Sequence, residues 1–393
     1  MAGPLEGIRV LDLTRVMSGP FATAMLADIG AEIIKVEMPG FGEEARHFGP
    51  YVEGVSAYFC LLNRGKKSIA VDLKAPEGVA LIRRIAESAD VVVENFRPGV
   101  TARLGLDAAT LRAANPRLVY ASITGFGAEG PLRDRPAFDL VIQAMSGLMS
   151  LTGERDGRPL PVGESLADVA TGMFASWGIL AALYERERTG EGRHVEVAMQ
   201  DAVLSMLLTG LSRELYTGRP AGRVGARHPE TYPVDSFAAR DGHFVLVGFT
   251  QRIVEGIFAA IGRPELSGDP RFATNDARNA NEAVLYGIIA EWAAGRTRDE
   301  AIAALAAAGV PCGPVRTLGE VAADPASTHT FARGAHAQLG DIPLVGQPVR
   351  FGADGRPEGA RAPTLGEDTD AVLAGLGLDA AAIDELKRKK VVA

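Results

Sequence analysis

The sequence has 393 residues, with 41 lysines and arginines against 49 aspartates and glutamates, and a formal net charge of -8. This charge, with no long basic run, argues against a nucleic-acid-binding surface, which needs clustered cations to displace counterions. The two cysteines, Cys60 and Cys312, are too few for a disulfide framework or a thiolate metal cluster. Apolar residues (47%) and charged residues (23%) occur at the frequencies of a soluble globular protein.

The first residues, Met-Ala-Gly-Pro-Leu-Glu-Gly, lack the charged and apolar regions of a secretory signal peptide. The most apolar stretches, such as 203–211, are shorter than the roughly 20 residues of a membrane-spanning helix. The six histidines show no pairing at metal-ligand spacing. We therefore expect a cytoplasmic protein without a bound metal and without a membrane partner.

Short apolar runs rich in β-forming residues alternate with helical patterns through the first half of the chain. Expected strands cover residues 8–13, 32–37, 69–73, 91–93, 118–123 and 194–198. Expected helices cover 20–29, 76–88, 108–114, 139–151 and 168–188, and a further helix starts at 200. Strands separated by helices predict right-handed βαβ units and a parallel sheet, which makes the fold class α/β and Rossmann-like.

A second, smaller α+β domain is expected after a change in composition, because glycine, arginine and proline accumulate at 217–229. Its pattern is a hairpin at 236–249 that turns at 240–242, followed by helices at 252–261, 281–294 and 298–308. The expected domains are a large domain at 1–200 plus 326–393, a linker at 201–224 and a small domain at 225–325.

The phosphate-binding and nucleophile motifs common in α/β proteins are missing. The chain after the first expected strand reads Leu-Thr-Arg-Val-Met-Ser-Gly-Pro, without the Gly-x-Gly-x-x-Gly of dinucleotide sites. There is no Walker A sequence and no Gly-x-Ser-x-Gly elbow. Candidate chemistry therefore rests on carboxylates.

Two aspartates stand where long apolar helices are expected to begin. Asp168 precedes one such helix and Asp139 opens another. Aspartate is among the best N-capping residues, and the pattern alone favours that role. The alternative is a carboxylate kept ionised by the positive end of the helix and available as a nucleophile. Glu164, taken alone, is a solvated charge.

Several stretches in the same order resemble the class III CoA-transferase family, the group of formyl-CoA and carnitine CoA-transferases. They include Glu-Asn-Phe-Arg-Pro-Gly at 94–99, and the full set is 5–14, 30–37, 62–69, 71–78, 93–99, 178–183, 198–202, 309–315 and 365–370. The resemblance covers essentially the whole chain. It implies a homodimer of interlocked subunits, with each site between large and small domains of different chains.

The resemblance also implies that Asp168 is the family's nucleophilic aspartate, which receives the acyl group of an acyl-CoA and passes CoA to a carboxylic acid; Asp139 is a second catalytic candidate. By similarity, coenzyme A, bound as acyl-CoA, contacts residues that follow the expected strands: Val16, Met17, Val71, Asp72, Leu73, Lys74, Asn95, Phe96 and Arg97, with Arg103 at the start of a helix. Arginine and lysine there suit the phosphates of CoA.

The substrates are less clearly indicated. Met17 stands where relatives that use formyl or oxalyl groups carry glutamine, so oxalate is not expected as a substrate. Arg15 and Arg46 could pair with a distal carboxylate, which suggests succinyl-CoA and a dicarboxylic acceptor, although both could instead be structural. Tyr232 is expected near the acyl end.

Two other functions remain open. A 2-methylacyl-CoA racemase is the first alternative, but related racemases carry histidine where this chain has Phe138, and racemisation needs two bases. A non-catalytic CoA-binding protein is the second, and the retained Asp168 argues against it.

Overall fold

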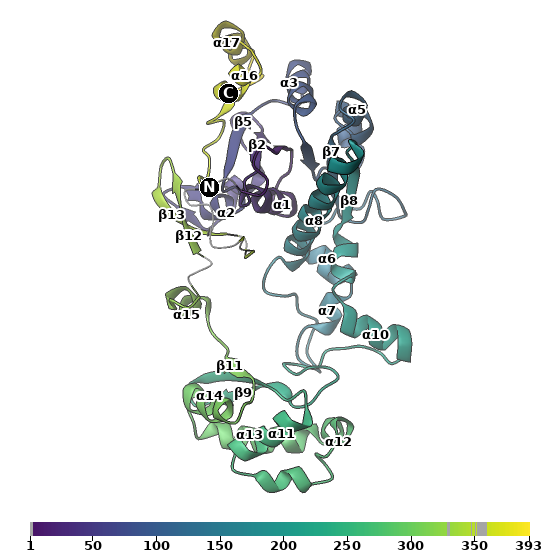
Figure 1. The fold of residues 1–393 in the computed structure, drawn as a ribbon, viewed down its shortest axis with the longest axis vertical. Helices are drawn as coiled ribbons and strands as arrows, with labels where there is room; N and C mark the ends of the chain where they lie inside the picture. Colours follow the sequence, from purple (N-terminus) through teal and green to yellow (C-terminus); the bar gives the residue numbers. More distant parts are fainter. Residues whose placement is uncertain (1–2, 328–330, 347, 350, 352–359) are drawn as a thin grey trace. The chain divides into compact units, whose positions relative to one another are not determined.

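The computed structural model describes residues 3–327, 331–346, 348–349, 351 and 360–393, and the chain forms two compact units (Figure 1). Unit 1 comprises Met1–Leu148, Pro161–Thr209 and His329–Ala393, and unit 2 comprises Met149–Leu160 and Gly210–Thr328. The linker expected at 201–224 is largely helical, because α9 (Met199–Leu204) and α10 (Leu208–Thr217) occupy most of it. The glycine- and proline-rich part begins only at Gly218.

Unit 1 is built on a six-stranded sheet in the order β5-β2-β1-β6-β7-β8, in which every neighbouring pair is parallel. The strands are β1 (Arg9–Asp12), β2 (Glu32–Glu37), β5 (Lys66–Ala70), β6 (Val91–Glu94), β7 (Val119–Thr124) and β8 (His194–Ala198). This order is the Rossmann order 3-2-1-4-5-6, which reverses direction between β1 and β6. The predicted α/β class and parallel sheet are therefore confirmed.

Helices cover both faces of this sheet, which explains the apolar strands without alternation. One face packs on α1 (Ser18–Ala27) and α8 (Leu166–Thr189), through residues such as Val10 and Val91. The other face packs on α3 (Pro76–Glu87), α5 (Ala108–Ala114), α16 (Thr369–Gly375) and α17 (Ala380–Arg388). The C-terminal helices are thus part of unit 1.

The remaining elements of unit 1 are short. They are η1 (Glu44–His47), β3 (Tyr51–Val52), β4 (Val55–Ser56), α2 (Ala57–Leu62), α4 (Val100–Leu104), α6 (Asp139–Met145), β12 (Phe331–His336) and β13 (Gly340–Val345). The single helix expected at 139–151 is wrong. Gly147 adopts φ +89°, which ends α6, and α7 (Leu148–Leu151) follows as a separate turn.

Unit 2 has its own core, made of a three-stranded antiparallel sheet and helices packed on it. The predicted hairpin is β9 (Val234–Ala239) paired with β10 (Gly242–Val247), and β11 (Cys312–Pro314) adds the third strand. The other elements are α11 (Gln251–Ala260), η2 (Pro264–Gly268), α12 (Asn275–Ala280), α13 (Glu282–Ala294), α14 (Arg298–Ala307) and α15 (Leu318–Ala323).

Helix α8 corrects one expectation about length. Its 24 residues are long and apolar enough to cross a membrane, so not every apolar segment of this chain is too short. Half of the apolar window of α8 is buried inside the protein, as in the core helix of a soluble protein. The length of α8 is therefore no indication of a membrane span.

Candidate active site

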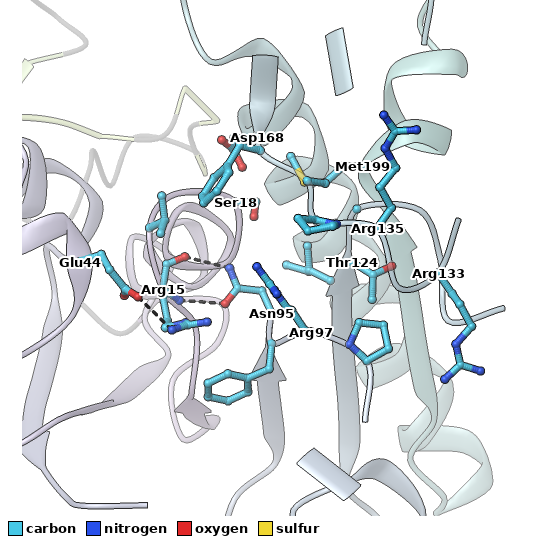
Figure 2. Close-up of a pocket in the computed structure, with 18 of the residues that line it drawn as sticks. Arg15, Ser18, Glu44, Asn95, Arg97, Thr124, Arg133, Arg135, Asp168 and Met199 are labelled. Atoms are coloured by element: carbon cyan, nitrogen blue, oxygen red, sulfur yellow. Dashed lines mark hydrogen bonds and ion pairs between the residues drawn. The ribbon is translucent and has the colours of Figure 1, made fainter. Parts of the chain in front are cut away.

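A cavity of about 460 Å³ lies at the carboxyl ends of β1, β6 and β7, beside the point where the strand order reverses. Open α/β sheets place their ligands at this position. Figure 2 shows the side chains around the cavity, among them Asp168, Ser18, Asn95 and Arg97. Each strand end contributes to the lining: Arg15 and Val16 follow β1, Asn95, Phe96 and Arg97 follow β6, and Thr124 ends β7.

Asp168 lies on the wall of this cavity, but it is not the N-cap of α8. The helix begins at Leu166, so Asp168 is its third residue and Ser165 is the N-cap. Ser165 makes no side-chain capping bond within the described part of the chain. Asp139, from α6, does the capping instead, since its Oδ1 accepts the backbone N–H of Ala167 at 2.7 Å and that of Asp168 at 3.3 Å. The capping explanation of Asp168 is therefore wrong.

The sequence allowed Asp139 to cap its own helix, α6, but in the structure Asp139 caps α8. Its second oxygen accepts a hydrogen bond from Gln143 Nε2 at 2.6 Å. Gln143 is buried, and its Oε1 accepts the backbone N–H of Val162. Asp139 is thus held by three donors on two elements, and it places a negative charge beside Asp168.

Burial raises the pKa of Asp168 to about 6, and the charge of Asp139 adds to this effect, while hydrogen bonds from Ser18 lower it. The helix terminus does not keep the pKa low, contrary to the sequence-based expectation. At neutral pH the carboxyl group is still mostly ionised. A carboxylate of higher basicity is a better nucleophile, so this environment favours attack on an electrophilic carbonyl.

Ser18 reaches Asp168 because α1 and α8 approach closely at Gly172. A Cβ atom on Gly172 would lie 2.7 Å from the backbone oxygen of Ser18 and 2.9 Å from the Phe21 ring. Glycine is therefore required one turn after the aspartate. It brings the start of α1 against the start of α8, so the donor and the carboxylate meet.

The loop between β1 and α1 is fixed in an unusual backbone conformation. Val16 has φ +66°, which a β-branched residue adopts only at a cost of about 1–3 kcal/mol. Asn95 bonds both backbone groups of Arg15, accepting its N–H at 2.9 Å and donating to its C=O at 2.8 Å. These bonds tie the ends of β1 and β6 together at the reversal point.

Two further cavities of unit 1 continue from the first along the strand ends. The second, about 200 Å³, shares Arg15, Glu44 and Phe96 with the first and includes Val71, Asp72, Leu73 and Lys74. The third, about 590 Å³, shares Met38, Asp72 and Lys74 with the second and reaches Lys387 and Lys390 at the C-terminus. The structure thus brings eight of the ten predicted CoA-contacting residues to the linings of the first two of these adjoining cavities.

The other two predicted CoA-contacting residues lie elsewhere. Met17 is 7% exposed and packs inward as the N-cap of α1. Arg103 stands near the end of α4 rather than at a helix start, and is exposed. Among the described residues, neither side chain lines one of these three cavities.

Two of the three candidate substrate residues are buried or already paired within the described part of the chain. Arg46 binds both carboxylate oxygens of Glu37, at 2.6 and 2.7 Å, and lies over the Phe59 ring, so its guanidinium is already satisfied. Tyr232 is 1% exposed and belongs to the hydrophobic core of unit 2. Of the three, Arg15 is the one that lines the first cavity described above, and its Nη1 forms a half-exposed ion pair with Glu44 at 2.9 Å.

Several lining residues were not predicted: Ser18, Glu44, Thr124, Arg133, Arg135 and Met199. Thr124 could have been found, because it follows the strand expected at 118–123 and stands at the carboxyl end of β7, at the same edge of the sheet. Tyr58, on α2, is also close to the carboxylates. Burial, with the charge of Asp168, raises the pKa of its hydroxyl well above the usual range, so this group stays protonated.

Phe138, where the resemblance implies a histidine in related racemases, lines the cavity. Its ring is 64% exposed and supplies no proton acceptor. Among the described residues, no group of three or more histidine, cysteine, aspartate or glutamate side chains could hold a metal ion. The chemistry available at this site is that of an ionised carboxylate flanked by arginines.

Comparison with known proteins agrees with this site. The model of CoA-transferase family III matches residues 5–369, and the chain belongs to this family. It is 42% identical to an acetyl-CoA:oxalate CoA-transferase of Acetobacter aceti, over 94% of this chain and 95% of that protein. It is 39% identical to a succinate–glutarate CoA-transferase of Agrobacterium fabrum, over 95% and 96% of the two chains.

Among solved structures, the chain is similar to a CaiB/BaiF family protein from Brucella suis. The TM-score is 0.85 at 38% identity, over 96% of this chain and all of that one. The protein is therefore a transferase that moves CoA between an acyl-CoA and a carboxylic acid, as the sequence predicts. The Acetobacter relative is named for oxalate. The expectation that this chain does not use oxalate stays a prediction.

Proposed function

We propose that Asp168 is the covalent acyl carrier of this CoA-transferase. The observation that supports this role is its position: a carboxylate on the wall of the cavity at the sheet's reversal point, with a pKa of about 6. It is ionised at neutral pH and needs no partner base to act as a nucleophile. Asp139 supports Asp168 in two ways: it caps α8, and its charge raises the pKa of the Asp168 carboxyl.

The reaction that this role implies conserves charge at every step. The Asp168 carboxylate attacks the thioester carbonyl, so a C–O bond forms, the C–S bond breaks and CoA leaves as thiolate. The thiolate then attacks the aspartyl carbonyl of this anhydride and expels the donor acid as its carboxylate. The acceptor carboxylate next attacks the aspartyl thioester, and the released thiolate attacks the acceptor's carbonyl, which regenerates Asp168. No proton, oxidant or metal enters the balance.

Acyl-CoA is proposed to lie along the three connected cavities, with its thioester near Asp168 and its phosphates toward Lys74. Lys74 is exposed and has no ion-pair partner among the described residues, which leaves its charge available to a phosphate. Lys67, on β5, is a matched control because it pairs with Glu32 on the surface. Lys74→Met should raise KM for acyl-CoA roughly 3- to 10-fold, whereas Lys67→Met should leave it unchanged; equal effects would contradict this placement.

The acceptor is proposed to be a small dicarboxylic acid, with succinyl-CoA as a donor. Arg15 supports this class because it faces the first cavity and its Nε and Nη2 atoms have no partner among the described residues. Guanidinium groups bind carboxylates in two-pronged geometry. The Agrobacterium relative, named for succinate and glutarate, is consistent with this choice.

The test is a matrix of donors and acceptors. Succinyl-CoA and acetyl-CoA are each offered with succinate, glutarate, oxalate and monocarboxylic acids, and new acyl-CoA products are followed by chromatography. Transfer to the longer dicarboxylic acids supports the proposal if Arg15→Met raises the KM for the acceptor by a larger factor than it lowers kcat. Preference for monocarboxylic acids would contradict the dicarboxylate class while leaving CoA transfer intact. Deuterium uptake from solvent at the α-carbon of a 2-methylacyl-CoA would instead indicate racemisation.

The interlocked homodimer is also proposed, and an exposed apolar face supports it. On α8, four residues at helical spacing point outward: Met173, Trp177, Leu180 and Tyr184, of which Trp177 and Tyr184 are each 69% exposed. An apolar strip of this kind marks an interface. If the chains interlock, dilution should yield no folded monomer, because dissociation requires unfolding. A reversible monomer–dimer equilibrium at nanomolar concentration, measured by sedimentation, would contradict this proposal.

A further inference from the structure

A buried ion pair, one member of which, Glu43, also lines the second cavity, holds the loop between β1 and α1. Glu43 accepts the backbone N–H of Val16 on its Oε2 at 2.9 Å. The ammonium group of Lys35, on β2, donates to the backbone oxygen of Thr14 at 2.9 Å and lies 3.5 Å from Glu43 Oε1. The two charges therefore contact the backbone on either side of Arg15.

Both charges are removed from solvent. The side chains of Lys35 and Glu43 are 0% and 3% exposed. Lys35 also lies near the charges of Asp12 and Glu37, and these carboxylates with Glu43 raise its pKa although burial lowers it. A buried ion pair adds little to stability compared with apolar residues of the same size. Stability alone is therefore a weak reason for placing these two charges here.

The conformation that they hold gives a better reason. Val16, whose N–H binds Glu43, is one of three residues other than glycine with a positive φ in the described part of the chain. Two residues later, Ser18 begins α1 and bonds to Asp168. If Val16 relaxed to an ordinary negative φ, the start of α1 would leave its direction and Ser18 would move off the carboxylate.

We propose that Glu43 and Lys35 are positioning residues for CoA transfer: they hold Val16 in the left-handed conformation that places Ser18 against Asp168. This inference rests on the proposed role of Asp168 as acyl carrier. It predicts a coupling between residue 43 and residue 16 in the rate of Asp168 acylation. The coupling follows because glycine adopts a positive φ without strain, so a glycine at position 16 needs no external support.

The experiment is a double-mutant cycle on the full-length protein. Glu43→Ala, Val16→Gly and the double variant are compared with the natural protein at saturating acyl-CoA. The rate of acylation is measured in a single turnover with hydroxylamine as the trap, so that changes in acyl-CoA affinity do not enter. Glu43→Gln is included because its amide oxygen can still accept the Val16 N–H, and it carries the comparison if Glu43→Ala does not fold.

The control removes another buried ion pair of the same unit. Arg64 binds Asp28 at the opposite end of α1, where the two side chains are 4% and 11% exposed. Asp28→Asn should lower stability without changing the acylation rate. This control separates positioning from a general loss of stability.

Glu43→Ala should slow acylation roughly 10-fold, and Glu43→Gln should slow it less. In the Val16→Gly background, the effect of Glu43→Ala should shrink to within about 2-fold. An unchanged rate in Glu43→Ala, or an equal loss in both backgrounds, overturns the inference. Failure of the proposed function is recognised separately, because Asp168→Asn would then remain active whatever the Glu43 variants do.

Discussion

Replacing Asp168 with asparagine should make the protein more stable while abolishing transfer. The pKa of this carboxyl is 3.8 in its ordinary state and about 6 in the folded protein, a difference of about two pH units. Below about pH 4 the group is protonated in both the folded and the unfolded protein. Between pH 4 and 6 the folded state binds more protons, so stability falls as the pH rises. Above pH 6 the full difference, up to ~3 kcal/mol, opposes folding.

Asparagine carries no charge, so this cost disappears. The free energy of unfolding, from guanidinium titrations followed by circular dichroism, should be higher for Asp168→Asn by up to ~3 kcal/mol at pH 7.5, and this difference should shrink to about 1 kcal/mol at pH 4.5. Because the chain has two units that can unfold separately, the unfolding transition of unit 1 must be followed on its own. A variant that is less stable by the ~0.5–2 kcal/mol of a lost helix cap, with the same difference at both pH values, would refute the reasoning.

Three other predictions concern the surroundings of the nucleophile. The acidic limb of kcat/KM should lie near pH 6 and move to lower pH in Asp139→Asn, because the charge of Asp139 raises the pKa of Asp168. Gly172→Ala should reduce kcat strongly, since its methyl group would push α1 away from α8. Arg46→Met should lower the free energy of unfolding by about 3–5 kcal/mol, because it leaves a buried carboxylate unpaired; unlike Arg15→Met, it should leave acceptor selectivity unchanged.

Each of these predictions has a result that would contradict it. The pH profile fails if the acidic limb of Asp139→Asn moves upward or stays in place. The claim that activity needs the close approach of α1 and α8 is contradicted if Gly172→Ala retains full kcat. The structural role of Arg46 fails if Arg46→Met is as stable as the natural protein and changes the order of preferred acceptors. Stability and kinetics are measured on the same preparations, so that partial unfolding is not mistaken for loss of catalysis.

The sheet and much of the cavity could be predicted because both depend on local pattern. Strands buried on two faces show as uninterrupted apolar runs, of which the three valines at 91–93 in β6 are a clear case. The family resemblance assigned Val16, Asn95 and Arg97 to one site, and the structure brings them to one cavity because the carboxyl ends of parallel strands meet at one edge.

The parts that could not be predicted depend on contacts distant in the sequence. Asp168 resembles a helix cap because the cap that replaces it, Asp139, comes from another helix, 29 residues earlier than Asp168. In the sequence Arg46 resembles a free cation, and only the structure shows that it pairs with Glu37. Tyr232 carries a polar group but lies in the core of unit 2. In each case tertiary packing, rather than local propensity, decides the role.

The central claim is that Asp168 becomes covalently activated, and chemical trapping tests it most directly. The protein is incubated with acyl-CoA and hydroxylamine, digested, and analysed by mass spectrometry. The account predicts a hydroxamate on the peptide that contains Asp168, formed only when acyl-CoA is present and absent from Asp168→Asn. A hydroxamate confined to a peptide with Asp139 or Glu164, or transfer by Asp168→Asn that has not deamidated to aspartate, would contradict it.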